Sequence, residues 1–396
     1  MKRAVGDVLT LLKEVGQEPV VLTGRDGNRV VVVTPGLVGR VLCTGFDGVG
    51  GPTASWIDEG QLRKGATPPA PGARWANFGG EERVWFGPEG GLFGLFFPPG
   101  QEQKHANYLV PEAMNSLAYQ VEHGPGVATS VMFSAAVHLV NYQDRPIDLQ
   151  VTRQVEVLDW CPFTLGLDNE VEFVGFQSRT YVKNAGVRAL TRQTGTACVW
   201  TLGIHPAREH SVVVLPFRGG PDAEWGEPLL TEYLKTGTVD FSHIPAGRRP
   251  SDYWAVKPRC ALIKASGSAQ NKLEMSPQRT LGRMAAVDLA GGTLTAVEFP
   301  TYPELDYCAP FWVPYAGDPF RGSALSVFVL GRWHGVEPFF ELECFSPALF
   351  LHPGQEYCHM SRTWHLRGDK AALAAACERS FFADFRAIEA FDRDAP

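Results

Sequence analysis

The sequence predicts an all-β protein built from antiparallel strands, and three observations lead to that class. Apolar and polar residues alternate with a period of two along many segments, as in strands with one buried face. The 396 residues include 42 glycines and 30 prolines, which supply turns between such strands. Strands do not alternate regularly with helices, which argues against a parallel α/β sheet. Roughly fifteen strands in one chain indicate a large sandwich.

The clearest strand covers residues 147–158, where Ile147, Leu149 and Val151 face one way and the polar residues between them face the other. Similar runs predict further strands near residues 30, 92, 130, 171, 197, 211, 324 and 338. Helices are expected at residues 4–15 and in an alanine-rich stretch from 369 to about 390. No linker divides the sequence, so we expect residues 1–396 to form a single domain with its core at about 26–367.

The composition argues against several classes of protein. The net charge is −7 and basic residues do not form long runs, unlike a nucleic-acid-binding surface. The longest apolar stretches have fewer than ten residues, which is too short for a membrane-spanning helix. The basic N-terminus is interrupted by Asp7 and lacks a small-residue cleavage site, so we interpret it as an amphipathic helix and not a signal peptide.

The eight cysteines lack the C-x-x-C spacing of a zinc site, and several lie inside apolar runs. We expect them to be reduced core residues, which suits a cytoplasmic protein. The glycines of GVGGP and GPEGG precede strands and loops, whereas a phosphate site needs glycines before a helix. We therefore expect no cofactor and no bound metal, and the oligomeric state is left open.

Residues 75–97 carry three carboxylates, an arginine and several aromatic side chains among six glycines. The charged residues are Glu81, Glu82, Arg83 and Glu89. Aromatic rings pack on the C–H faces of sugars, and carboxylates and arginine bind sugar hydroxyls in pairs of hydrogen bonds. The segment therefore has the chemistry of a carbohydrate pocket. The alternative is a tight hairpin between core strands, with Glu82 and Arg83 as a solvated pair.

Residues 338–365 place two carboxylates, Glu341 and Glu343, on one face of a strand rich in Phe, Leu and Cys. A carboxyl group buried there would have a raised pKa and could act as a general acid or base. Alternation supports equally a strand whose two glutamates point to solvent. The pattern does not distinguish bulk solvent from a pocket.

Two groups of motifs in this sequence resemble those of known proteins. Leu342-Glu343, the turn Pro353-Gly354-Gln355-x-Tyr357 and the final strand at 363–366 are similar to the C-terminal signature of aldose 1-epimerases, or galactose mutarotases. Asn77 and the GGEERVWFGPEGG block after it resemble an uncharacterised bacterial family with the galactose-mutarotase-like fold. That family's pattern also matches Gly39 to Gly51, with Trp56 beyond, and Tyr315, Gly317 and Asp318. The resemblance spans about residues 38–366.

The resemblance implies an antiparallel β-supersandwich with a sugar-binding cleft on a concave sheet. In mutarotases a Glu removes the proton of the anomeric hydroxyl while a His protonates the ring oxygen, which opens the ring. Glu343 matches that Glu, and His205 in His205-Pro206 is the candidate acid, with His334, His359 and His365 as alternatives. The expected substrate-binding residues are Arg83, Glu89, Trp85, Asn77, Glu82, Trp56 and Asp318. We expect Glu343, Arg83 and Glu89 to lie in one pocket.

Two other functions remain open. A glycoside hydrolase or lyase needs two carboxyl groups about 5–10 Å apart, which Glu343 could form with Glu89 or Asp318. A variant of that reading places a calcium ion among Glu81, Glu82, Glu89 and Glu343, although no D-x-D-x-D-G loop is present. A carbohydrate-binding protein without catalysis would use Trp56, Trp85 and Trp312 as stacking surfaces. The expected partner in each case is a mono- or oligosaccharide.

Overall fold

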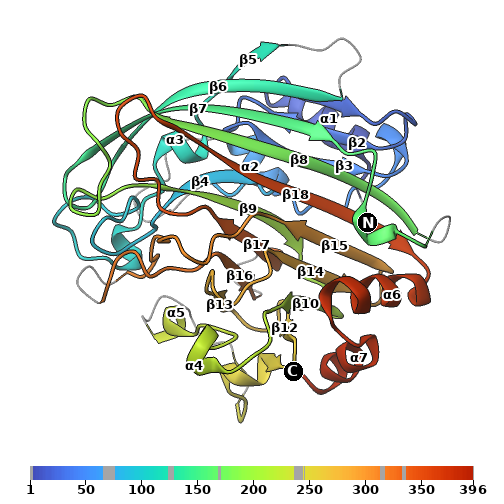
Figure 1. Ribbon diagram of the computed structural model, residues 1–396. Helices are drawn as coiled ribbons and strands as arrows, with labels where there is room; N and C mark the ends of the chain where they lie inside the picture. Colours follow the sequence, from blue (N-terminus) through green and yellow to red (C-terminus); the bar gives the residue numbers. More distant parts are fainter. Residues whose placement is uncertain are drawn as a thin grey trace.

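In the computed structural model, two antiparallel sheets pack face to face, and a smaller third sheet lies beside them (Figure 1). The structure describes residues 3–65, 76–123, 129–167, 171–235, 244, 246–312, 317–331 and 336–395. All the pairings between its named strands are antiparallel, which confirms the fold class that the sequence predicts.

The largest sheet has ten strands. Their spatial order is β11 (Trp254–Val256), β12 (Cys260–Lys264), β10 (Ser211–Pro216), β14 (Arg283–Asp288), β15 (Thr293–Glu298), β18 (Glu356–Gly368), β8 (Val171–Asn184), β7 (Pro146–Val157), β6 (Ser130–Val140) and β5 (Gln120–His123). Along β7 buried and half-buried residues alternate after the first position, because every second side chain faces the other sheet.

The two remaining sheets are shorter. The five-stranded sheet has the order β13 (Asn271–Met275), β16 (Leu325–Leu330), β17 (Phe339–Phe345), β9 (Cys198–Pro206) and β4 (Arg83–Gly87). The three-stranded sheet has the order β1 (Val20–Thr23), β2 (Val30–Thr34) and β3 (Arg40–Gly45). Every residue of β17 and β4 is buried, so both faces of the five-stranded sheet are covered.

The three longest α-helices in the described residues lie near the ends of the chain, as the sequence predicts, and four shorter ones lie between them. The α-helices are α1 (Val5–Glu14), α2 (Glu59–Lys64), α3 (Glu112–Asn115), α4 (Asp222–Trp225), α5 (Glu232–Lys235), α6 (Lys370–Phe381) and α7 (Phe385–Asp394). Short 3₁₀ turns are η1 (Gly48–Gly50), η2 (His105–Asn107), η3 (Pro162–Thr164) and η4 (Pro250–Tyr253). The C-terminal helical stretch is divided between α6 and α7, because Phe382 ends α6 in a left-handed conformation with φ 56°. None of the helices in the described part of the chain has the length and apolar character that crossing a bilayer requires.

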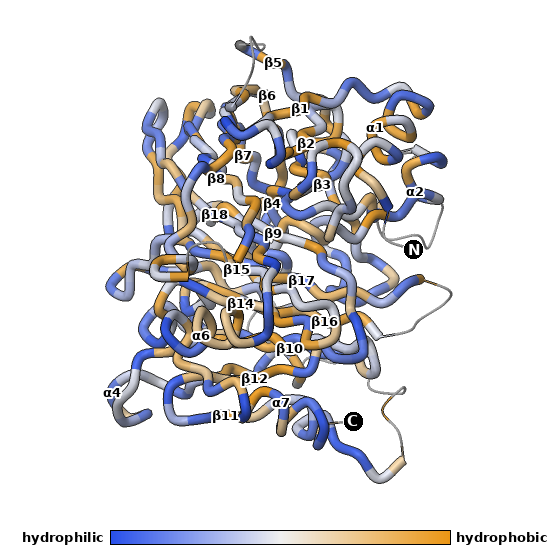
Figure 2. The backbone as a smooth tube through the Cα atoms, turned by 90° about the vertical axis from the view of Figure 1, so that its right-hand side faces the viewer, coloured by the Kyte–Doolittle hydropathy of each residue, from blue (hydrophilic) through white to orange (hydrophobic). Residues whose placement is uncertain are grey.

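The main hydrophobic core lies between the ten-stranded and five-stranded sheets. Hydrophobic residues occur along many of the strands, and many of the outer turns carry hydrophilic residues (Figure 2). A second cluster fills the space between the ten-stranded sheet and helices α6 and α7, and a third lies under α1. All eight cysteines are free thiols and seven are buried, with Cys358 exposed.

One predicted strand is wrong. The apolar run at residues 92–97 forms turns and bends, although all but one of its residues are buried. The amide of Gly94 donates to the carbonyl of Gly91 in a tight turn, and Gly91 has φ 82°. A run that turns this sharply cannot pair along its length, so its phenylalanines fill the core from a loop.

Candidate functional site

Strand pairing brings five residues from five strands into one row across the five-stranded sheet. Arg83 pairs with Leu202, Leu202 with Glu343, Glu343 with Ser326, and Ser326 with Glu274. Directly paired residues of antiparallel strands project from the same face. We call the side that carries this row the site face.

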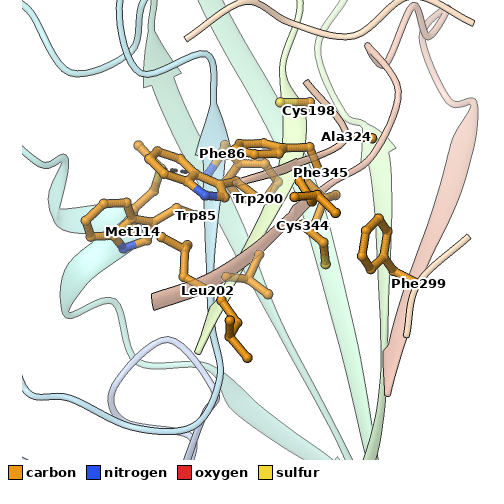
Figure 3. Packing of buried hydrophobic residues seen from close by; sticks show 14 of the residues in the cluster. Trp85, Phe86, Met114, Cys198, Trp200, Leu202, Phe299, Ala324, Cys344 and Phe345 are labelled. Atoms are coloured by element: carbon orange, nitrogen blue, oxygen red, sulfur yellow. Dashed lines mark hydrogen bonds between the residues drawn. The ribbon is translucent and has the colours of Figure 1, made fainter. Parts of the chain in front are cut away.

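The site face also carries the residues two positions along each strand from that row. These are Lys272, Glu341 and Phe328 in one direction, and Trp85, Trp200 and Phe345 in the other. Figure 3 shows Trp85, Trp200 and Phe345 gathered together, and the ring centroids of Trp200 and Phe345 are 5.4 Å apart. On the site face, charged residues therefore lie mainly on one side of the row and aromatic residues on the other.

Neither glutamate of β17 points into bulk solvent. Glu343 is 0% exposed and Glu341 is 6% exposed. The alternate residues Phe340, Leu342 and Cys344 pack into the core between the sheets. Both glutamates consequently need partners on the site face, because an unpaired buried carboxylate is very unfavourable.

The carboxylate of Glu343 has two partners. Nε1 of Trp200 donates to its Oε2 at 3.0 Å, and Nζ of Lys272 lies 3.3 Å from the same atom. Burial raises the pKa of Glu343 to about 7, with Lys272 opposing that rise and the charges of Glu341 and Glu89 adding to it. A carboxyl group with this pKa can accept or release a proton near neutral pH.

Two cations balance the carboxylates of this face. Nη2 of Arg83 donates to Oε1 of Glu341 at 2.8 Å, and the guanidinium lies 4.4 Å from the centre of the Trp85 ring. Although burial alone would lower it, the pKa of Lys272 is raised, chiefly by the charge of Glu343. The Arg83–Glu341 and Lys272–Glu343 pairs lie side by side, since Glu341 and Glu343 are two residues apart on β17.

Glu89 joins the same cluster through two tyrosines. Its carboxylate accepts hydrogen bonds from the hydroxyls of Tyr108 at 3.0 Å and Tyr233 at 2.8 Å. Burial and the charge of Glu89 raise the pKa of both hydroxyls well above the usual value. The Tyr233 ring also lies 4.8 Å from Nζ of Lys272. The structure thus brings Arg83, Glu89 and Glu343 together.

His205 does not lie with Glu343. It pairs with Phe340, three residues before Glu343, so its ring projects from the opposite face of the sheet into the layer between the sheets. It is 3% exposed and its ring is 5.7 Å from that of His365. Burial, with a contribution from His365, lowers the pKa of His205 to about 3. The expected Glu343–His205 pair is therefore not formed, and His205 is neutral at physiological pH.

His365 and His359, the alternative acids that the structure describes, do not lie on the site face either. Nε2 of His365 lies 3.0 Å from Oε2 of Glu81 between the sheets. His359, also between the sheets, has Nε2 3.7 Å from the sulfur of Cys344. His334 lies outside the described residues.

Glu82 holds the two sheets together and is not half of a solvated pair with Arg83. It is 1% exposed, pairs with Arg153 of β7, and accepts hydrogen bonds from Ser178 at 2.8 Å and Ser361 at 2.6 Å. Glu82 and Arg83 are successive residues, so their side chains project from opposite faces of the five-stranded sheet. The expectation of a substrate-binding role for Glu82 is not supported by this placement.

Three further expected binding residues lie apart from the charged cluster. Trp56 packs on Phe339 beyond Glu341, with ring centroids 4.8 Å apart. Oδ1 of Asn77 accepts a hydrogen bond from the amide of Gly79 at 3.1 Å and so shapes a local turn. Asp318 lies at the surface, where Oδ2 is 3.1 Å from Nη2 of Arg192. Tyr315 of the same motif lies outside the described residues.

A model of a family of unknown function, DUF6786, matches residues 4–391. The chain belongs to that family. No curated protein matches the chain.

Two solved structures are similar to this DUF6786 protein at low sequence identity. One is a protein from Escherichia coli K12, provisionally described as an aldose 1-epimerase, with 11% identity and a TM-score of 0.47 over 89% of this chain and 100% of that one. The other is the Slr1438 protein from Synechocystis sp. PCC 6803, with 12% identity and a TM-score of 0.49 over 89% of this chain and 96% of that one.

Sequence reasoning missed several residues of the site in this DUF6786 chain. Lys272 and Glu274 come from β13, and Trp200, Tyr108 and Tyr233 come from three other segments. The string Asn271-Lys-Leu-Glu-Met275 did offer a signal, because two charged residues alternate with apolar ones in a short strand. Its pairing with β16 is what places these charges beside Glu343, and pairing cannot be read from alternation.

The described residues contain no group of three or more His, Cys, Asp or Glu side chains that could hold a metal ion. Glu81 and Glu82 form their contacts between the sheets, whereas Glu89 and Glu343 lie on the site face. The four carboxylates weighed as calcium ligands are therefore divided between two places. On the site face, Glu343 is a buried carboxyl group with a pKa of about 7, beside charged and aromatic side chains.

Proposed function

We propose that this protein binds a sugar at the site face and interconverts its anomers, with Glu343 as the general base. The observation that carries the proposal is the fully buried Glu343 carboxylate, held by Trp200 and Lys272 with a pKa of about 7. A base whose pKa is near the working pH is ionised often enough to act and basic enough to remove a hydroxyl proton.

The neighbours of Glu343 support a sugar as the ligand. Arg83 presents a guanidinium packed on an indole, and Trp85 and Trp200 present aromatic surface beside the carboxylates. Carboxylates and arginine recognise hydroxyl groups by directed hydrogen bonds, while aromatic rings favour the apolar faces of a sugar. The Leu342-Glu343 motif adds the resemblance to aldose 1-epimerases.

In the proposed reaction Glu343 acts as the general base. Its carboxylate accepts the proton of the anomeric hydroxyl, the C1–O5 bond breaks, and the bonding electrons pass to the ring oxygen. An acid then protonates that oxygen and gives the open-chain aldehyde. Rotation about C1–C2 and reversal of these steps closes the ring as the other anomer.

Because Glu343 is completely buried, a sugar reaches it only when covering side chains move. Tyr233 of α5 is one such side chain, since its ring lies over Lys272 and its hydroxyl is bonded to Glu89. Displacement of Tyr233 would free Oε2 of Glu89 for a hydroxyl group of the sugar, while Tyr108 stays bonded to Oε1. In this scheme the sugar binds to Glu89 only when Tyr233 has moved, and the same movement helps to expose Glu343.

Exchange NMR on a panel of aldoses and uronic acids tests the proposal. Each sugar is measured with wild type, with Glu343→Gln, and without protein. The proposal predicts faster anomer exchange for at least one sugar with wild type and loss of that acceleration in Glu343→Gln. No acceleration with any sugar, combined with line broadening from binding, would contradict catalysis and favour a hydrolase or a binding protein. Oligosaccharides would then be the next panel.

A further inference from the structure

Glu274 is a further buried carboxyl group on the site face, beside Glu343, Glu341 and Glu89. It is 0% exposed, and neither of its carboxyl oxygens has a hydrogen-bond partner among the residues that the structure describes. The hydroxyl of Ser326, the next residue in the row, is also buried and likewise lacks a partner within the described part of the chain. Buried polar groups are normally hydrogen-bonded, so two adjacent exceptions indicate groups kept for a ligand.

The row places Glu274 at a useful distance from Glu343. Ser326 is paired with both residues, so their strands are separated by one strand only. Neighbouring strands lie about 4.8 Å apart, so the two backbones are about 10 Å apart. Both side chains project from the same face, with Ser326 between them in the row. Lys272, two residues from Glu274, already spans this interval to reach Glu343.

The surroundings of Glu274 favour its neutral, protonated form. Burial raises its pKa to about 8, opposed by Lys272 and reinforced by the negative charges of Glu343, Glu89 and Glu232. The charge of Lys272, whose ammonium is bonded to Glu343, offsets only part of the effect of burial. At neutral pH Glu274 is therefore a hydrogen-bond donor that has no acceptor in the described structure.

Among the residues that the structure describes, four other side chains of this cluster have their donors bonded to carboxylates. Arg83 is bonded to Glu341, Lys272 to Glu343, and the hydroxyls of Tyr108 and Tyr233 to Glu89. The raised pKa values of the two tyrosines also make them poor acids. Of the described carboxyl groups on this face, Glu274 is the one with no hydrogen-bond partner in the described part of the chain.

We infer that Glu274 is the general acid of the site and that Ser326 binds the sugar between Glu274 and Glu343. The inference rests on the proposed anomer interconversion. As Glu343 accepts the anomeric O–H proton and the C1–O5 bond breaks, the ring oxygen takes the proton of Glu274. The Glu274 carboxylate recovers that proton when the ring closes, while Glu343 returns its own, so no other reactant is required.

Glu274→Gln is the test variant, because it replaces one neutral group by another of the same shape at neutral pH. Anomer exchange is measured between pH 5.5 and 9.5 with wild type, Glu274→Gln, and the surface control Glu122→Gln on β5. We expect wild type to be most active near pH 7.5, between the two raised pKa values. Glu274→Gln should lose about 100-fold in rate or more with little change in KM, and should lose the decline above pH 8. The control should match wild type.

A second measurement does not depend on catalysis. In protein labelled with ¹³C at the glutamate carboxyl carbon, the signal missing from Glu274→Gln identifies Glu274, which should titrate near pH 8. If wild type accelerates a sugar but Glu274→Gln keeps the full rate and pH profile, Glu274 is not the acid and the proposed function stands. If Glu274 titrates at the ordinary position near pH 4.5, the inference is overturned whatever the rates. If wild type accelerates no sugar, the proposed function fails, and this inference fails with it.

Discussion

Replacing Lys272 with methionine removes the cation that faces Glu343 and leaves a side chain of similar length. Nζ of Lys272 lies 3.3 Å from Oε2 of Glu343. At an effective dielectric constant of about 20, unit charges at that distance attract by about 5 kcal/mol. One pKa unit corresponds to about 1.4 kcal/mol, so the upper limit for the change is between three and four units. We expect the pKa of Glu343 to rise from about 7 by at least one unit.

The assay is the NMR titration of the Glu343 carboxyl carbon, assigned by its absence from Glu343→Gln. The pH profile of anomer exchange gives an independent measure of the Glu343 pKa, because the acidic limb of the profile should shift to higher pH as that pKa rises. Lys264→Met is the matched control. Lys264 is also a buried lysine bonded to a carboxylate, that of Asp392 in α7, but it lies on β12 of the other large sheet.

The control should lose stability without moving the titration of Glu343, and thermal unfolding will show whether both variants are folded. The reasoning is refuted if Glu343 titrates near pH 4.5 in wild type. It is equally refuted if Lys272→Met is folded and leaves the pKa of Glu343 unchanged, since the cation would then have no electrostatic effect on the carboxylate.

Three further changes test the structure through the free energy of unfolding. Arg153→Met leaves the buried Glu82 carboxylate without its charged partner and should cost about 3–5 kcal/mol in urea unfolding; a loss below 1 kcal/mol would contradict the pairing. Glu274→Gln should stabilise the protein at pH 9 but not at pH 4, because a folded-state pKa raised from 4.5 to about 8 lowers stability as pH rises between those values. Equal stability changes at both pH values would argue against a raised pKa. Gly79→Ala should be strongly destabilising, because Gly79 has φ 81° and an added Cβ would lie 2.1 Å from the carbonyl oxygen of Trp56. A melting temperature like that of wild type would contradict the close contact between Gly79 and Trp56.

Local pattern was enough to predict much of the fold. The alternation at 147–158 and the run near 130 became β7 and β6, which bury mainly one face, while the apolar runs near 30 and 338 became β2 and β17, which are buried on both faces. The run at 92–97 misled because its composition is that of a strand, whereas the glycines around it impose turns. An apolar run forms a strand only where no turn interrupts its backbone.

The candidate site was predictable only in part, and register explains why. Glu343 and Arg83 were found from motifs carried by their own strands. The resemblance to mutarotases made His205 the expected acid for Glu343. Glu343 pairs with Leu202, which lies three residues before His205 on β9, so the His205 and Glu343 side chains face opposite sides of the sheet. Glu274 was missed because its importance comes from pairing with Ser326 across strands that are distant in sequence.

The central claim is that Glu343 accepts a proton from a bound sugar. Its most direct test is the rate of anomer exchange at pH 7.5 for the sugar that wild type accelerates most, measured with wild type, Glu343→Gln and Glu122→Gln at equal concentration. The account predicts that Glu343→Gln loses the acceleration by about 100-fold or more while Glu122→Gln retains it. Equal acceleration by wild type and folded Glu343→Gln would contradict it.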